Sequence, residues 1–311
     1  MDDARLTQAE RAEISGALLD VARHGRTLMT AIMLTDPWPG SPARALFDDP
    51  INTHPGWHGT SVTHVAMQTI QIAVLAGFDH LAGMAALLRG NKPAAASLST
   101  LTRGGLEVLS RPHWLLKNSD ARSLAVATAC LSFAELGYSE RYEQSIAGVS
   151  GDRVTAKEFR QQITAWALRE RAEMYTPPKF AAMTSALIND VIPAEIQGAH
   201  GDATYGDLYY SQLSAVAHGQ SFAIAMFAQV DVPENPADVS PEDISLQVPR
   251  ELALDDAQTM LRCTVHVTAQ LAHLAWPPTA VNDRWRAACD RSLARFAALE
   301  GAPPWEYPTF D

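Results

Sequence analysis

The sequence contains little cysteine, few aromatic residues and no long apolar run. Its three cysteines, Cys130, Cys263 and Cys289, lie far apart, so they form neither a disulfide framework nor the spacing of a zinc site. Aromatic residues make up only 7% of the 311 residues. Runs of β-branched residues are scarce while Ala and Leu are abundant, which favours helices over sheets. We therefore expect an all-α fold.

Basic residues are also in short supply. Lys and Arg total 24 against 35 Asp and Glu, which gives a net charge of −11 that repels polyanions. The first residues, MDDARLTQAERAE, are polar and acidic, unlike a secretory signal. Gln, His, Ser and Gly interrupt the charge-poor stretches, so none is typical of a membrane span. We expect a cytoplasmic protein that binds neither nucleic acid nor membrane.

Apolar periodicity and capping signals predict a bundle of about eight to ten helices, with buried polar stripes, in a single domain over residues 1–311. Thr7 with Glu10, and Thr155 with Glu158, each form a capping box that begins a helix. The main helices are predicted over residues 7–34, 59–88, 93–116, 124–134, 155–174, 208–230, 250–276 and 281–300, with shorter ones near 177–193.

Two segments are predicted to lie outside this helical pattern. Residues 35–58 read as a long loop with five prolines and with Trp38 and Trp57, whose aromatic rings suggest a packed lid. Residues 231–249 are acidic and rich in proline, as in an exposed connector.

The segment Leu208 to Val230 carries no formal charge, yet it has a polar stripe at helical spacing. The stripe starts at Asp207 and continues through Ser211, Ser214, His218 and Ser221, in steps of four and three residues that share one helical face. A long uncharged helix is expected to be buried, and buried polar groups need partners.

Two other predicted helices offer such partners. Asp79 is the only formal charge in residues 59–88, and Arg103 and Glu107 lie four apart in residues 93–116. The adjacent Gly104 and Gly105 each cost a helix about 1 kcal/mol relative to Ala. We therefore expect another element to approach the backbone closely at these glycines.

If the polar faces meet, the bundle contains an acid/base site. Arg103 would fix an anionic ligand, and Glu107 or His218 would act as the base. The alternatives are an ordinary Arg103–Glu107 ion pair and a purely structural histidine. The candidate catalytic residues are His218, Glu107, Arg103, Asp79 and His80, and the candidate ligand-binding residues are Ser214, Ser211, Trp114, Trp57 and Glu135.

No organic cofactor or metal is assigned to this site. The sequence has no glycine-rich phosphate loop, no GxSxG elbow and no CxxC, so nucleotide-dependent transfer, serine hydrolysis and thiol redox chemistry have no motif to support them. A metal-dependent enzyme remains an alternative, because four histidines lie within a short stretch: His54, His58, His64 and His80. Pro55 and Gly56 disfavour a helix across the first pair.

A resemblance adds a further alternative. Its motifs are Asp79-His80, Arg103-x-x-x-Glu107 followed by Trp114, and Leu213-Ser214-x-x-x-His218-Gly219. Over residues 60–230 the chain resembles uncharacterised all-helical actinobacterial proteins of about this length, which are distantly similar to the HEPN superfamily. In HEPN ribonucleases an arginine precedes the catalytic histidine by five to seven residues, but here those positions are Ser211, Gln212 and Leu213.

These observations leave several functions open. The leading hypothesis is an enzyme or ligand-binding protein for a small molecule, with a buried acid/base site. The resemblance implies instead an interaction or defence-associated protein that lacks the ribonuclease arginine. A homodimer through an apolar helix face is compatible with both. Neither the substrate nor the reaction can be read from the sequence.

Overall fold

The computed structural model is a helical bundle. It describes residues 5–34, 36–90, 95–140, 145–147, 153–192, 203–227, 229–230, 246–247, 249–301, 305–308 and 310. These residues form eleven α-helices and only short strands, which confirms the all-α fold.

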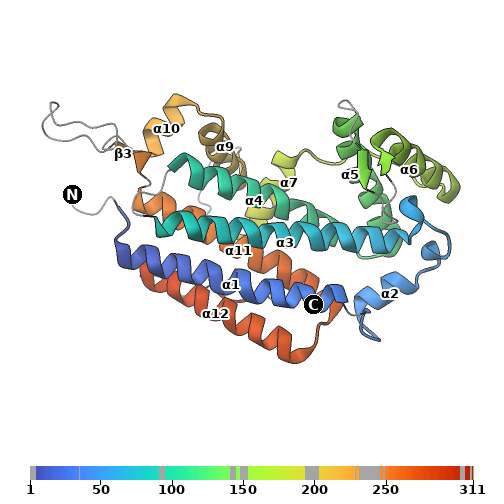
Figure 1. The fold of residues 1–311 in the computed structure, drawn as a ribbon, viewed down its shortest axis with the longest axis horizontal. Coiled ribbons are helices and arrows are strands. Elements are labelled where there is room, and N and C mark those ends of the chain that lie inside the picture. The colour runs from blue at the N-terminus through green and yellow to red at the C-terminus, as the bar shows by residue number, and fades with distance from the viewer. Residues whose placement is uncertain are drawn as a thin grey trace, which may run out of the picture.

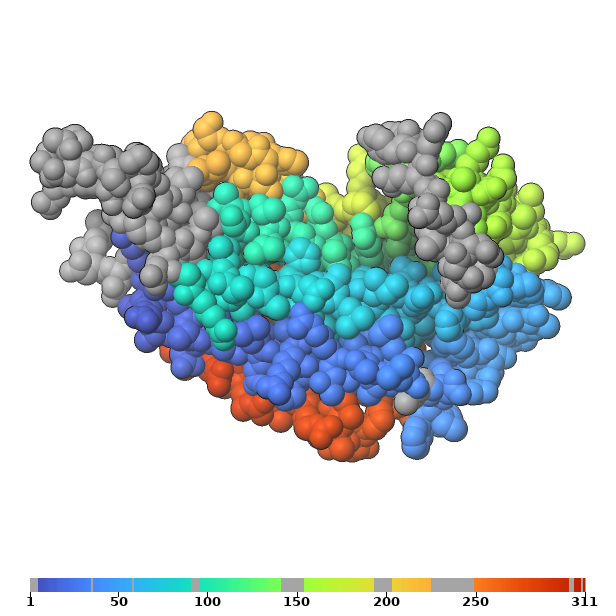
Figure 2. Space-filling model, viewed as in Figure 1, coloured from blue at the N-terminus to red at the C-terminus, as the bar shows by residue number. Residues whose placement is uncertain are grey.

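Five long helices run along the long axis of the molecule (Figure 1). They are α1 (Gln8–Leu34), α3 (Val62–Arg89), α4 (Ala95–Leu116), α11 (Arg250–Ala275) and α12 (Thr279–Glu300). Helix α1 lies between α3 and α12, and Figure 2 shows α12, α1, α3 and α4 as successive bands across one face. The predicted capping box begins α1, where the Thr7 N–H donates to Glu10 Oε2 at 2.8 Å and the Glu10 N–H donates to Thr7 Oγ1 at 3.2 Å.

The main core lies among these five helices. Phe78 of α3 meets Trp285 of α12 edge to face, with ring centroids 6.0 Å apart, and both side chains are fully buried. Burial of a large apolar side chain contributes about 1.5–3 kcal/mol. The apolar faces of the long helices therefore account for much of the stability of the bundle.

Close backbone approach at the glycine pair of α4 is confirmed. A Cβ atom on Gly104 would lie 2.8 Å from Cε1 of His80 in α3, and one on Gly105 would lie 2.3 Å from Cε of Met260 in α11. The two glycines thus allow α3 and α11 to pack against α4. Pro93, the predicted start of this helix, lies outside the described residues.

A second core lies between α5 (Ala121–Glu140) and α6 (Ala156–Glu170). It includes Trp57, whose ring centroid lies 4.9 Å from that of Trp166. The prediction of a long loop over residues 35–58 is wrong in part, because the segment contains α2 (Pro42–Asp48), η1 (Pro50–Thr53) and η2 (Trp57–Gly59). The side chains of Ser41 and Asp49 cap the first two of these helices.

The prediction of one helix over residues 208–230 is also wrong. The chain forms α9 (Tyr205–Ala217) and α10 (Ser221–Phe227), which lie on α4 together with α7 (Phe180–Val191). The break falls at His218 and Gly219, where Gly219 has a φ of +68°, in the left-handed region that favours glycine.

Two short hairpins complete the described structure. Strand β1 (Ser145–Ala147) pairs with β2 (Arg153–Thr155), and β3 (Gln229–Val230) pairs with β4 (Leu246–Gln247), both antiparallel. The predicted connector over residues 231–249 lies outside the described residues except for β4 and Pro249.

Helix α3 is the one described helix that is long and apolar enough to cross a membrane by length and composition. It packs against α1 and α4 and supplies many residues of the main core. The same composition is expected of a central bundle helix.

Candidate functional site

Four side chains from α4 and α9 meet in what we call the α4–α9 cluster: Arg103, Glu107, Tyr210 and His218. Arg103 Nε donates to Glu107 Oε1 at 2.9 Å, and Tyr210 Oη donates to the same oxygen at 2.8 Å. Arg103 NH1 lies 3.2 Å from Nε2 of His218. The structure thus brings together three predicted catalytic residues from two helices.

The α4–α9 cluster depends on which face of α9 points inward. Gly206, Tyr209, Leu213 and Val216 are buried at helical spacing, and they direct α9 against the bundle. Gly206 allows the closest approach, because a Cβ atom there would lie 2.3 Å from the backbone oxygen of Ser185 in α7.

The predicted burial of the polar stripe is wrong for this reason. Ser211, His218 and Ser221 are exposed and Ser214 is half-buried. Asp207 is exposed and caps α9 with Thr204. The apolar residues of α9 recur at the same spacing as the polar ones, so the absence of charge did not identify the buried face.

Partial burial strengthens the interactions of the α4–α9 cluster. The side chains of Arg103 and Glu107 are 21% and 26% exposed. Burial opposes the charge of Arg103, but its interactions with Tyr210 and Glu107 outweigh this and raise its pKa. Burial and the hydrogen bond to Glu107 raise the pKa of Tyr210, which keeps the phenol protonated as a donor.

The contact with Arg103 determines which ring nitrogen of His218 acts as the acceptor. A guanidinium group has only donors, so Nε2 of His218 accepts from Arg103 and carries a lone pair. His218 is also the C-cap of α9, next to the left-handed Gly219. The ring therefore sits at an exposed helix end with its acceptor nitrogen turned toward a cation.

The two predicted residues of α3 point to different neighbours. His80 lies against Gly104 of α4, and its buried Nδ1 has no hydrogen-bond partner among the described residues. Asp79 instead accepts from Arg26 of α1 at 2.6 Å and is 74% exposed. Consecutive helical residues point about 100° apart, so Asp79 does not reach the cluster.

The predicted ligand-binding residues are dispersed. Trp57 belongs to the second core. Trp114 meets Tyr175 edge to face at 6.4 Å. Glu135 lies 3.1 Å from Arg111 Nε without the alignment of a hydrogen bond, and burial raises its pKa against the opposing effect of Arg111. Ser211 and Ser214 lie on α9, on the side of Tyr210 and His218 in the helical pattern.

Tyr210 is the member of the α4–α9 cluster that was not predicted. It precedes Ser214 and His218 in steps of four residues, which places it on their helical face. This spacing is the signal that could have identified it.

A second polar network, also not predicted, links α4, α7 and α11. His113 is buried and its Nε2 lies 3.0 Å from Oδ2 of Asp190, which also accepts from Lys117 at 2.6 Å. Burial and the charge of Lys117 lower the pKa of His113. The ring of His266 is tilted against that of His113, with ring centroids 5.4 Å apart, and burial lowers the pKa of His266 to about 4. The two neutral imidazole rings therefore connect α4 to α11 inside the bundle.

Asp256 of α11 is a buried carboxyl group that the sequence did not single out. It accepts from Tyr209 Oη at 2.7 Å and from Ser99 Oγ at 3.2 Å. Burial raises its pKa to about 7, against the effect of these hydrogen bonds. Asp256 thus ties α9 and α4 to α11.

The histidine-rich stretch forms no metal site in the described part of the chain. No group of three or more His, Cys, Asp or Glu side chains there could hold a metal ion. His64 and His80 lie on the same straight helix, sixteen residues or about 24 Å apart. The side chain of His58 lies outside the described residues.

The chain has no significant match among protein-family models, curated proteins or solved structures.

Proposed function

We propose that the chain is a small-molecule enzyme that transfers protons to or from an anionic substrate at the α4–α9 cluster. The observation that carries this proposal is the contact between Arg103 NH1 and His218 Nε2 at 3.2 Å. It sets an anion-binding group beside a proton acceptor, which are the two functions that such chemistry requires.

Each residue of the cluster has a role in this proposal. Glu107 holds the guanidinium plane through Nε and is itself oriented by Tyr210. The remaining N–H groups of Arg103 bind a carboxylate or phosphate. An anion that takes the NH1 donor frees the lone pair of His218 Nε2, which then accepts a proton from the substrate.

Turnover of small carboxylates and phosphate esters, followed by NMR, tests this proposal. For a substrate of the parent protein, His218→Gln is expected to lower kcat by about a hundredfold or more. Arg103→Gln is expected to raise KM through loss of the charge-assisted contact. The control is Arg291→Gln, which breaks the ion pair with Asp20 between α12 and α1. Parent rates in the His218 and Arg103 variants would overturn the assignment.

A HEPN-like role is the second candidate, and one contact favours it. The arginine that is absent from positions 211–213 has a spatial counterpart, because Arg103 of α4 lies against His218. In this case the Arg–His pair would bind RNA or a protein partner without turning over small molecules. Gel-shift titration with labelled RNA separates the two candidates: RNA binding that Arg103→Gln abolishes supports this one, and no binding by the parent protein rules out its RNA form.

A further inference from the structure

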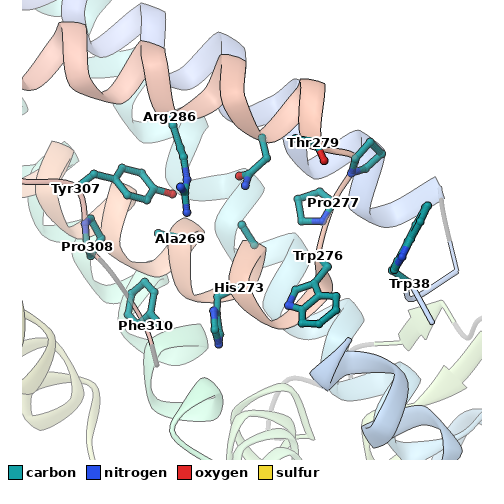
Figure 3. A pocket seen from close by; sticks show the side chains of 13 residues that line it. Trp38, Ala269, His273, Trp276, Pro277, Thr279, Arg286, Tyr307, Pro308 and Phe310 are labelled. Atoms are coloured by element: carbon teal, nitrogen blue, oxygen red, sulfur yellow. The ribbon is translucent and has the colours of Figure 1, made fainter. Parts of the chain in front are cut away.

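A cavity of about 560 Å³ lies at the start of α12, which we call the α12 cavity. It is bounded by α11, α12, the C-terminal residues and Trp38 (Figure 3). Its volume is within the range of small-molecule sites, roughly 300–1,000 Å³. Helix α12 packs on α1 and α11, whereas α9 packs on α4 and α7, so this cavity is separate from the α4–α9 cluster.

Aromatic rings line the α12 cavity. Trp38 and Trp276 are 60% and 47% exposed, which is unusual for two tryptophans on one cavity. Trp276 has a φ of +48°, in the left-handed region that bulky residues avoid, and a Cβ atom on Gly40 would lie 4.0 Å from Cζ3 of its ring. Phe310 and Tyr307 form the opposite side (Figure 3), where Trp285 Nε1 donates to Tyr307 Oη at 3.1 Å.

A charged group of α12 faces the same space. The guanidinium of Arg286 lies 5.2 Å above the ring of Tyr307 and forms no ion pair with any residue that the structure describes. Figure 3 shows it extending from α12 into the cavity. Asn282 also lines the cavity, but its Oδ1 is buried away from it.

These features define the chemistry of a ligand. Exposed indoles bind flat aromatic rings by stacking. The guanidinium of Arg286 has the Tyr307 side chain, and no carboxylate, as its partner among the described residues, so it can bind a carboxylate or phosphate. We propose that the α12 cavity binds a planar aromatic anion, with the ring on Trp276 and Trp38 and the anionic group on Arg286.

Four probes separate these contributions in calorimetric titrations of the full chain. Indole-3-acetate and 1-naphthaleneacetate each have an aromatic ring and a carboxylate, whereas indole lacks the carboxylate and acetate lacks the ring. The two aromatic carboxylates are expected to bind most tightly, with indole weaker than indole-3-acetate by about tenfold and acetate undetected. Adenosine 5′-monophosphate, bound more tightly than adenosine, would show that the cavity also accepts a phosphate as the anion.

Substitutions in the α12 cavity test whether indole-3-acetate binds there. Arg286→Gln and Trp276→Ala are each expected to lower the affinity for indole-3-acetate by about tenfold or more. The matched controls are Arg284→Gln, an exposed charge two residues earlier on α12, and Phe222→Ala, an exposed aromatic residue on α10. Circular dichroism establishes that each variant keeps its helices.

Three outcomes would overturn the proposal. The first is that neither indole-3-acetate nor adenosine 5′-monophosphate binds at millimolar concentration. The second is equal affinity for indole and indole-3-acetate, which would remove the role of Arg286. The third is unchanged binding in both Arg286→Gln and Trp276→Ala, which would place the ligand elsewhere.

Discussion

The guanidinium of Arg103 and the imidazole of His218 meet at 3.2 Å although the residues lie 115 positions apart in the sequence. The contact joins the middle of α4 to the C-terminal end of α9. Glu107 and Tyr210 hold the guanidinium from its other side. The pair is therefore fixed by the packing of two helices and not by one local motif.

The first prediction concerns the tautomer of His218. Because Arg103 donates to Nε2, the neutral ring is expected to carry its hydrogen on Nδ1. Long-range ¹H–¹⁵N spectra of the side chain distinguish the two tautomers. In Arg103→Gln the ring ¹⁵N chemical shifts of His218 are expected to move toward the values of free histidine, in which both tautomers are populated. A parent ring with its hydrogen on Nε2 would contradict the contact.

The second prediction compares two glycines. In Gly206→Ala the new methyl group would lie 2.3 Å from the backbone oxygen of Ser185, which cannot move without shifting α7. A loss of about 3 kcal/mol in the free energy of unfolding is expected. In Gly83→Ala the nearest atom is Cδ2 of Leu101 at 3.5 Å, an ordinary contact, so a gain of about 0.5–1 kcal/mol is expected.

Urea unfolding of both glycine variants provides the measurement. The order of stability is expected to be Gly83→Ala, then the parent protein, then Gly206→Ala. If Gly206→Ala were as stable as the parent, α9 would not be seated on α7 as described, and the geometry of the α4–α9 cluster would lose its support.

The third prediction concerns stability and pH at Asp256. Its pKa is raised from 3.8 to about 7 in the folded protein, so the folded state binds the proton more tightly than the unfolded state does. The resulting stabilisation is complete below about pH 4 and is lost as the pH rises through about 7. Its full size is of the order of 4 kcal/mol.

Asp256→Asn removes this titration. The stability of the parent relative to the variant is therefore expected to fall between about pH 4 and pH 7. His266, whose pKa is lowered to about 4, acts in the opposite sense, so the two proteins must be compared at each pH. Denaturation curves provide the measurement. A difference between them that does not change with pH would exclude a raised pKa at Asp256.

Local features of the fold could be predicted from the sequence. The capping boxes at Thr7 and Thr155 formed as predicted, because a cap needs only residues within one helical turn. The close approach at Gly104 was also predicted, because a glycine inside a helix destabilises that helix and is expected only where another element packs closely against it.

Contacts between residues that are distant in the sequence could not be predicted from it. In α9 the apolar and polar residues repeat with the same period, so the pattern placed His218 on a face but did not show that Tyr209 and Leu213 point inward. The contact of Asp79 with Arg26 likewise depends on the position of α1. Both contacts depend on how the helices pack together, which cannot be predicted from helical periodicity alone.

The most direct test of the central claim is ligand-observed NMR with small carboxylates and phosphate esters. The α4–α9 cluster predicts that at least one compound binds the parent protein and the Arg291→Gln control equally and loses its binding to Arg103→Gln and His218→Gln. If every compound that binds the parent also binds the Arg103 and His218 variants with the same affinity, the cluster is not the functional site.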